Sequence, residues 1–179
     1  MGINTLNNKA IFLDRDGVLN KSIVKYGKPY PPRSKEELSI PSGVKKGVSL
    51  LKENGFMLIM ITNQPDVSRG KISLKKVEEI NQFLSKELKL DDVFCCIHDD
   101  KDMCQCRKPK PGMIIEAIYK WKIDVSKSFL IGDRWKDIEA GKQTNLKTIL
   151  LDYDYNEKRT KPDYSCSKFM QAVKIIIET

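Results

Sequence analysis

The chain has 179 residues, enough for one well-packed domain and too few for two, so we expect a single domain over residues 1–179. Hydrophobic residues make up 40% and charged residues 31%, which is ordinary for a globular protein, and no run of eighteen apolar residues is present to span a membrane. The net charge of +8 suits an anionic partner, either a phosphorylated small molecule or nucleic acid, but no basic block resembles a nucleic-acid-binding arm.

The first ten residues, MGINTLNNKA, lack the apolar core of a secretion signal, so we expect a cytoplasmic protein. The chain contains five cysteines, and four of them lie within twelve residues. In a protein without a secretion signal, this crowding favours reduced thiols that bind a metal over disulfide bonds.

Apolar runs of strand length alternate along the chain with segments of helical periodicity. Residues 21–41 interrupt this alternation and are expected to form a loop, with Ser34 and Glu37 as the capping box of one helical turn. In chain order, the sequence predicts strand 9–13, helix 44–54, strand 56–62, helix 73–88, strand 93–97, helix 111–122, strand 128–132, helix 135–144, strand 147–153 and helix 168–177.

The predicted strands are apolar throughout instead of alternating with polar residues, which is typical of strands that are covered on both faces. The sequence therefore predicts a doubly wound α/β fold around a parallel sheet. In such sheets, ligands bind outside the carboxyl ends of the strands. Polar residues follow three of the strands: Asp14 and Asp16 the first, Thr62 to Gln64 the second, and Asp133 the fourth. We expect them to meet at one site.

Four carboxylates at this edge, Asp14, Asp16, Asp133 and Asp137, form a candidate site for a hard divalent cation such as Mg²⁺. A carboxylate beside such a cation can attack phosphorus, and a second one two residues later can move the proton of the leaving group and then of water. The spacing of Asp14 and Asp16 alone equally fits a turn after a strand. Asp133 and Asp137 also fit the start of a helix, which carboxylates stabilise.

Two further motifs carry polar groups suited to phosphate. Thr62 and Asn63 offer a hydroxyl and an amide at a strand end, and Lys108 precedes a helix that begins with proline. Taken singly, each motif equally fits a turn or a solvated loop. The cluster Cys96, His98, Cys104 and Cys106 is more specific, because three thiolates and one imidazole complete a tetrahedral structural zinc site. Its neighbour Cys95 lies on the other side of the predicted strand and is expected to be buried and unligated.

The order of these motifs resembles the haloacid dehalogenase-like (HAD-like) phosphatases, and the resemblance spans about residues 9–150. It implies a Rossmann-like fold and a Mg²⁺-dependent phosphohydrolase in which Asp14 is the nucleophile and Asp16 the general acid and base. It further implies that Asp14, the backbone carbonyl of Asp16 and Asp133 hold Mg²⁺, with Asp137 in support. Thr62 and Lys108 would stabilise the transferring phosphoryl group.

The zinc motif together with LDRDG and TNQ looks like one subgroup, which contains D-glycero-D-manno-heptose 1,7-bisphosphate 7-phosphatase and the phosphatase domain of histidinol-phosphate phosphatase. The spacing of His98 and Cys104 is closer to the histidinol-phosphate type, whereas QPDVSRGKIS, residues 64–73, resembles the heptose type and lies beside the site. We therefore favour the heptose bisphosphate as substrate. By resemblance, the substrate contacts are Asn63, Gln64, Arg69, Arg107 and Arg134.

No segment is long enough for a cap domain, because 25 residues separate Asp16 from Ser42 and the 45 residues from Thr62 to Lys108 are used by a helix, a strand and the zinc loop. Selectivity is then expected from short loops, above all residues 21–33, with Lys25 near the mouth of the site. We expect a monomer that binds a small phosphorylated sugar. The role of Arg15 is open: its side chain either points away from the site or helps to set the turn, and the resemblance allows both the turn and a substrate contact.

Three other functions fit parts of this pattern. The same chemistry can act on histidinol phosphate, or on a 3′-phosphate at a nucleic-acid end. The second is disfavoured because no stretch combines aromatic and basic residues into a stacking platform. A non-catalytic zinc-stabilised binding module is disfavoured by the complete set of acids, hydroxyl and lysine.

Overall fold

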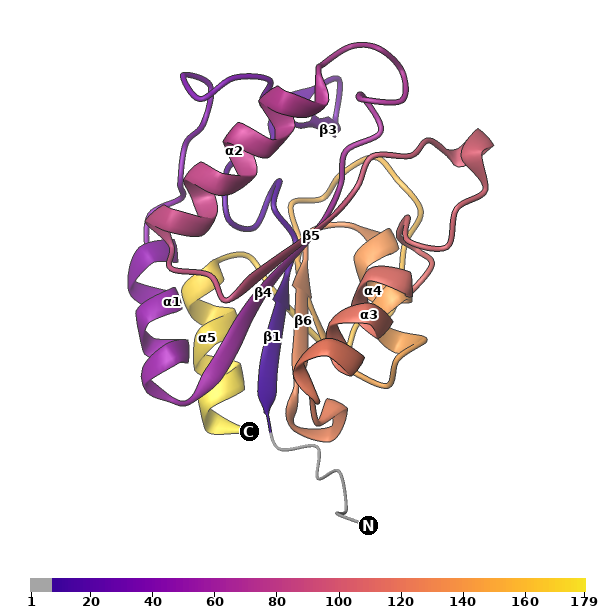
Figure 1. The fold of residues 1–179 in the computed structure, drawn as a ribbon. Helices are drawn as coiled ribbons and strands as arrows, with labels where there is room; N and C mark the ends of the chain where they lie inside the picture. Colours follow the sequence, from indigo (N-terminus) through magenta and orange to yellow (C-terminus); the bar gives the residue numbers. More distant parts are fainter. Residues whose placement is uncertain (1–7) are drawn as a thin grey trace.

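A computed structural model describes residues 8–179, and its centre is a six-stranded parallel sheet in the order β5-β4-β1-β6-β7-β8 (Figure 1). A separate antiparallel hairpin, β2-β3, precedes the first helix. The strands are β1 (Lys9–Leu13), β2 (Ile23–Lys25), β3 (Lys28–Tyr30), β4 (Phe56–Asn63), β5 (Asp92–Cys96), β6 (Phe129–Gly132), β7 (Lys147–Leu151) and β8 (Tyr164–Cys166).

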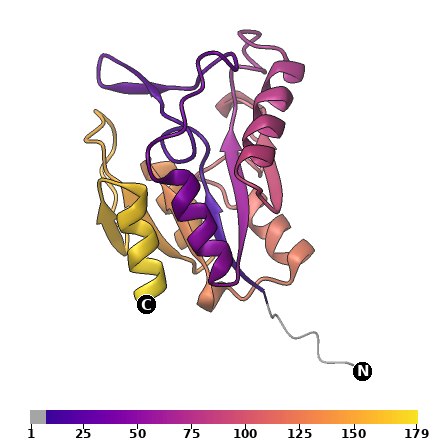
Figure 2. The ribbon, with the colours of Figure 1, turned by 90° about the vertical axis from the view of Figure 1, so that its left-hand side faces the viewer.

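Helices cover both faces of the sheet, so this is the doubly wound arrangement that the apolar strands predicted. Figures 1 and 2 show α1, α2 and α5 on one face and α3 and α4 on the other. The five α-helices are α1 (Val44–Glu53), α2 (Leu74–Glu87), α3 (Gly112–Trp121), α4 (Trp135–Lys142) and α5 (Phe169–Glu178), with short 3₁₀ turns at Asp100–Asp102 and Val125–Lys127.

The alternation of side chains along each strand divides the core into two layers. In β1, Ile11 and Leu13 join the layer under α1 and α5, whereas Ala10 and Phe12 join the layer under α3 and α4. All four side chains are fully buried. A strand that is buried on both faces must be apolar at every position, which explains its continuous hydrophobic sequence.

Strand β1 lies between β4 and β6, so the chain runs to one side of β1 first and then to the other. This reversal opens a crevice at the carboxyl ends of the central strands. Residues 14–16 follow β1 at this point, Thr62 and Asn63 end β4, and Asp133 follows β6. The fold therefore brings the polar motifs together at one edge of the sheet.

The structure corrects several expectations about the elements. Residues 21–41 are not only loop, because β2 and β3 form a hairpin there, and β8 was not predicted at all. No helical turn begins at Ser34; the Glu37 carboxylate instead accepts a hydrogen bond of 2.7 Å from the backbone N–H of Arg33. Strand β4 extends to Asn63, and β7 ends at Leu151.

Among residues 8–179, no segment forms a cap domain over the sheet, and no helix is long and apolar enough to cross a membrane. The interpretation of the amino-terminal sequence as lacking a secretion signal concerns residues 1–10, of which residues 1–7 lie outside the described part.

Candidate active site

Three carboxylates and one ammonium group form the floor of the site. Oxygen atoms of Asp14, Asp133 and Asp137 lie within 4.8 Å of one another, and all three residues are buried. The Nζ atom of Lys108 lies 2.9 Å from Oδ1 of Asp14 and 2.6 Å from Oδ1 of Asp137, and it donates to the carbonyl of Ile61 at 2.8 Å. The sequence predicted this grouping, although Lys108 comes from a loop and not from a strand end.

The three buried carboxylates leave an excess of negative charge. Burial, together with the charge of Asp137, raises the pKa of Asp14 to about 7, although Lys108 opposes the rise. Burial and the charges of Asp14 and Asp137 likewise raise the pKa of Asp133 well above its usual value. For Lys108, burial lowers the pKa, but the charges of Asp137 and Asp14 outweigh burial and raise it.

These groups fit a hard divalent cation. Within residues 8–179, neither oxygen of the buried Asp133 side chain accepts a hydrogen bond. An unpartnered buried carboxylate is costly, and a cation that takes its lone pairs removes that cost. Carboxylate oxygens in small number, with positions left for water and phosphate, are the donor set that Mg²⁺ prefers.

The chain passes close to Asp133 at Gly17, whose φ of +87° is a conformation that L side chains rarely adopt. A Cβ atom on Gly17 would lie only 1.8 Å from Oδ2 of Asp133. Glycine at this position therefore allows the turn after β1 to pack directly against the candidate cation site.

Replacing Gly17 with alanine is expected to displace Asp133 and lower catalytic turnover by about 10²-fold, the loss typical of a displacement of about 1 Å in an active site. Gly55→Ala is the matched control, because Gly55 has a similar φ of +76° and its Cβ would meet only Lys9 at 3.7 Å. Both variants bear the left-handed strain of about 1–2 kcal/mol. Equal turnover in the two variants would contradict the close packing inferred at Asp133.

The side chain of Asp16 does not join the three-carboxylate group. Its Oδ2 accepts from Arg15 Nη2 at 3.0 Å and from Gln64 Nε2 at 2.8 Å, and its Oδ1 accepts from Asn20 Nδ2 at 3.0 Å. These contacts occupy both oxygens of the Asp16 carboxylate, so its side chain is not part of the group, although the sequence predicted a site of four carboxylates that included it. The same contacts locate the side chain of Arg15, which is fully buried against Asp16 and does not line the cleft.

The TNQ motif lies at the end of β4, but its side chains form hydrogen bonds to other residues of the site. Thr62 is fully buried, and its Oγ1 accepts from Gln64 Nε2 at 2.9 Å. Asn63 donates to the backbone carbonyl of Lys108 at 3.0 Å and accepts from the N–H of the same residue at 3.1 Å. Asn63 thereby fixes the backbone at Lys108, and Gln64 connects Thr62 to Asp16.

A cleft of about 430 Å³ opens above these groups. Its floor is lined by Asp14, Asp16, Asn63, Lys108 and Asp137. Cationic side chains outnumber anionic ones along its walls. The cations are Lys28, Arg33, Arg69, Lys71, Arg107, Lys108, Arg134 and Lys136. Such a surface attracts an anionic molecule.

The three arginines predicted to contact substrate all line this cleft, and each is already paired with an acid. Arg69 forms a bidentate contact with Asp99 at 2.6 and 2.8 Å. Nε of Arg107 donates to Asp100 at 2.8 Å, whereas its buried Nη1 has no partner within residues 8–179.

Arg134 donates to Oε2 of Glu157 at 2.8 and 2.6 Å. Glu157 and its neighbour Asn156 belong to the segment between β7 and β8, to which the sequence assigned no role. Asn156 reaches the hairpin, since its N–H donates to the carbonyl of Gly27 at 3.1 Å. The hairpin does contribute to the cleft as expected, but through Lys28 and Tyr30, and Lys25 is not among the lining residues.

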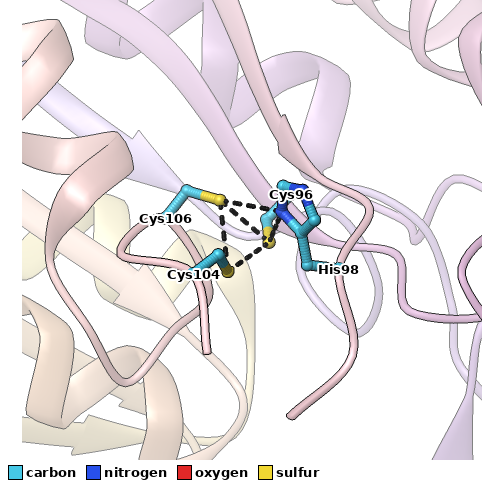
Figure 3. A group of neighbouring side chains, drawn as sticks. All are labelled: Cys96, His98, Cys104 and Cys106. Carbon is cyan, nitrogen blue, oxygen red and sulfur yellow. Dashed lines mark hydrogen bonds between the residues drawn. The ribbon is translucent and has the colours of Figure 1, made fainter. Parts of the chain in front are cut away.

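The second candidate metal site lies at the end of β5, and Figure 3 shows its four side chains. The ligand atoms of Cys96, His98, Cys104 and Cys106 all lie within 4.8 Å of one another. The sulfur atoms are 3.2–3.7 Å apart, and Nδ1 of His98 is 3.3 Å from the sulfur of Cys106. Tetrahedral zinc with Zn–S bonds of about 2.3 Å separates sulfurs by roughly 3.8 Å, so the cluster fits zinc. Cys95 is half-buried and outside the group.

The segment between these ligands is tied to the cleft. Ser68 donates to Oδ2 of Asp102 at 2.8 Å, and Arg69 and Arg107 hold Asp99 and Asp100. Cys106 directly precedes Arg107 and Lys108. A closed four-ligand zinc site here would therefore support the cleft walls and leave no open position for catalysis.

A family model and the sequences of known relatives both match this chain, and they indicate the same family. A family model described as HAD-hydrolase-like matches residues 105–171. The D-glycero-beta-D-manno-heptose-1,7-bisphosphate 7-phosphatase of Helicobacter pylori is 34% identical, over 94% of this chain and 98% of that protein. The D-glycero-alpha-D-manno-heptose-1,7-bisphosphate 7-phosphatase of Photorhabdus laumondii is 35% identical, over 80% of this chain and 81% of its own length.

Solved structures share the fold. The D,D-heptose 1,7-bisphosphate phosphatase from B. bronchiseptica, complexed with magnesium and phosphate, matches with a TM-score of 0.81. The match covers 95% of this chain and 98% of that chain, at 22% sequence identity.

Proposed function

Since the chain belongs to the HAD-like phosphatases, we propose that it removes the 7-phosphate of D-glycero-D-manno-heptose 1,7-bisphosphate in a Mg²⁺-dependent reaction. The observation that carries the proposal is the cluster of Asp14, Asp133, Asp137 and Lys108 at the floor of a cleft whose walls carry more cations than anions. The curated relatives named above support the choice of substrate.

Mg²⁺ would be held by Asp14, Asp133 and the backbone carbonyl of Asp16, with Asp137 in support, and would supply positive charge to the phosphoryl oxygens. Lys108 is held at 2.9 Å from Asp14 and contributes a second, fixed positive charge beside the nucleophile. Thr62 lies at the end of the neighbouring strand, where its hydroxyl would stabilise the same phosphoryl group.

In the first step, an Asp14 oxygen attacks phosphorus, and the bond from phosphorus to the sugar oxygen breaks. Asp16 gives that oxygen a proton, so the sugar leaves with a neutral hydroxyl group at this position and an aspartyl-phosphate remains on Asp14. In the second step, Asp16 takes a proton from water, the water oxygen bonds to phosphorus, and the bond to Asp14 breaks. Inorganic phosphate leaves, and both carboxyl groups return to their starting states.

A sugar that carries two phosphates needs cations beyond those at the reacting phosphate. Arg69, Arg107 and Arg134 line the cleft and would contact such a substrate, with Asn63 on the same wall, whereas Gln64 is buried and would act through Asp16. Because their guanidinium groups are paired with acids, they are held in fixed orientations before the substrate arrives.

We further propose a structural Zn²⁺ at the cysteine–histidine cluster, a single domain over residues 1–179, a monomeric state and a cytoplasmic location. Nucleic acid is not proposed as a partner. Among residues 8–179, only Tyr30 and Trp135 are aromatic residues along the walls of the cleft.

The proposal predicts that kcat/KM is highest for the heptose 1,7-bisphosphate, that turnover stops when EDTA removes the cation, and that added Mg²⁺ restores it. Phosphate release is measured side by side from both anomers of the bisphosphate and from histidinol phosphate, with Mg²⁺ and with EDTA. Preference for histidinol phosphate, which the short spacing of His98 and Cys104 favours, would retain the mechanism and reject the proposed substrate. Release of no phosphate from any of them would reject both.

A further inference from the structure

We infer that Arg15 and Asn81 are positioning residues that fix the orientation of the Asp16 carboxylate for the step in which water releases phosphate from Asp14. The inference rests on the function proposed above, because that function gives Asp16 its task. The backbone N–H of Arg15 donates to Oδ1 of Asp14 at 2.7 Å, but the side chains of Arg15 and Asn81 belong to neither candidate metal site and do not line the cleft. Their effect on the reaction therefore passes through Asp16.

Arg15 connects the turn after β1 to helix α2. Its Nε lies 3.2 Å from each oxygen of Asp16, and its Nη2 lies 3.0 Å from Oδ2. On the opposite side, its Nη1 donates to Oδ1 of Asn81 at 2.9 Å. Asn81 is 66 positions away in the sequence and buried in α2. One guanidinium group thus joins Asp16 to a helix that packs on the sheet.

The burial of Arg15 makes this contact rigid. The residue is fully buried, and a guanidinium group is retained in such a place only when its N–H groups are satisfied. The planar fork of arginine fixes the plane of the carboxylate that it contacts, which a lysine cannot do. Asn81 in turn fixes the plane of the fork.

The other partners of Asp16 agree with one fixed orientation. Asn20 donates to Oδ1 and Gln64 donates to Oδ2, so both oxygens accept hydrogen bonds from N–H groups. Rotation of the carboxylate would break several of these bonds at once. Asp16 still faces the cleft, where water that attacks an aspartyl-phosphate would enter.

A substrate whose leaving group needs no proton allows the second step, the hydrolysis of aspartyl-phosphate, to be measured separately from the first. p-Nitrophenol ionises readily, so cleavage of p-nitrophenyl phosphate forms aspartyl-phosphate at Asp14 without a proton from Asp16. An Asp16 carboxylate that is ionised at the start stays ionised through this step, and it must still take a proton from water before phosphate leaves. A disoriented Asp16 therefore slows only the second step with this substrate, and slows both steps with a sugar phosphate.

The experiment is rapid-quench kinetics of p-nitrophenyl phosphate with the Mg²⁺-loaded full chain, comparing Arg15→Lys and Asn81→Ala with the unmodified protein. We expect the first equivalent of p-nitrophenol to form at the unmodified rate and the steady-state rate to fall by about tenfold or more, a part of the 10²–10⁴-fold that proton transfer contributes. Phosphorylated protein should accumulate in both variants. Asn81→Ala retains Arg15 and the turn, so it answers the question if Arg15→Lys folds poorly.

Ile80→Val is the matched control, because Ile80 is buried in α2 beside Asn81 and has no part in the contacts of Arg15. It should behave like the unmodified protein. Equal slowing of the burst and the steady state in Asn81→Ala, or a steady-state loss in Ile80→Val as large as in Asn81→Ala, would overturn the inference. Failure of the proposed function is distinguishable, because then the unmodified protein releases no phosphate from either a sugar phosphate or p-nitrophenyl phosphate.

Discussion

Asp14→Asn is expected to lower phosphate release by at least about 10⁴-fold, the order of loss that follows removal of a covalent nucleophile from a hydrolase. An amide cannot form the aspartyl-phosphate, and it is a weaker ligand for Mg²⁺ than a carboxylate. Steady-state phosphate release with saturating Mg²⁺ measures the effect, and intact-mass analysis excludes contamination by unmodified protein.

The fold of this variant should be intact. The pKa of Asp14 is raised to about 7, so its ionised form is disfavoured in the folded protein. A neutral amide removes that cost, and Lys108 keeps its contact with Asp137 at 2.6 Å. Above pH 7 and without a divalent cation, the variant should therefore unfold at an equal or higher temperature than the unmodified protein. Asp152→Asn serves as the control and should retain activity. Asp152 follows the carboxyl end of β7 and does not line the cleft. Retention of turnover by Asp14→Asn would refute the mechanism.

Cys106→Ser is expected to abolish zinc binding and to lower both stability and activity. If zinc is present at about 100 times its dissociation constant, its loss removes about 2.7 kcal/mol of stabilisation, or roughly 5–11 °C in Tm for a chain of this size. Activity should fall because Cys106 directly precedes Arg107 and Lys108. Metal content by mass spectrometry, thermal unfolding and phosphate release measure the three effects.

Cys95→Ser is the matched control for this prediction. Cys95 is adjacent to Cys96 in β5 but outside the four-residue cluster, so the variant should keep one zinc per chain. Full activity in a Cys106→Ser protein without zinc would show that the cluster does not support Lys108. Loss of zinc from Cys95→Ser would show that the ligand set is wrong.

The central sheet and the meeting of the acidic motifs were predictable because they follow from local pattern and one topological rule. A strand such as β1 or β4, buried on both faces, is recognisable from its uninterrupted apolar sequence. Once the strands are parallel, their carboxyl ends share an edge, and the order β4-β1-β6 then places Asp14, Thr62 and Asp133 at the ends of neighbouring strands.

The hairpin and β8 were not predictable for an equally physical reason. Strands β2 and β3 have three residues each and are mostly exposed, so they show no hydrophobic pattern. Their turn has positive φ at Tyr26 and Gly27, but Tyr-Gly lacks the Asn-Gly or Asp-Gly signal of such turns. Strand β8 is also short and forms through pairing with β7.

The hydrogen-bond partners of individual side chains could not be predicted, because they lie far away in the sequence. Asn63 and Gln64 were expected at the substrate, yet their amides bind the backbone of Lys108 and the carboxylate of Asp16. The place of Arg15 became clear only through Asn81, which no local spacing connects to it. Residue type and order predicted which groups gather, whereas three-dimensional packing determines how each is oriented.

The most direct test of the mechanism is acid quenching of the Mg²⁺-loaded protein during turnover of the heptose 1,7-bisphosphate, followed by peptide mass spectrometry. The account predicts a phosphate adduct on the peptide that contains Asp14, and its absence from the same peptide of Asp14→Asn. Turnover with no adduct at Asp14, or with the adduct on another residue, would contradict the assignment of Asp14 as the nucleophile.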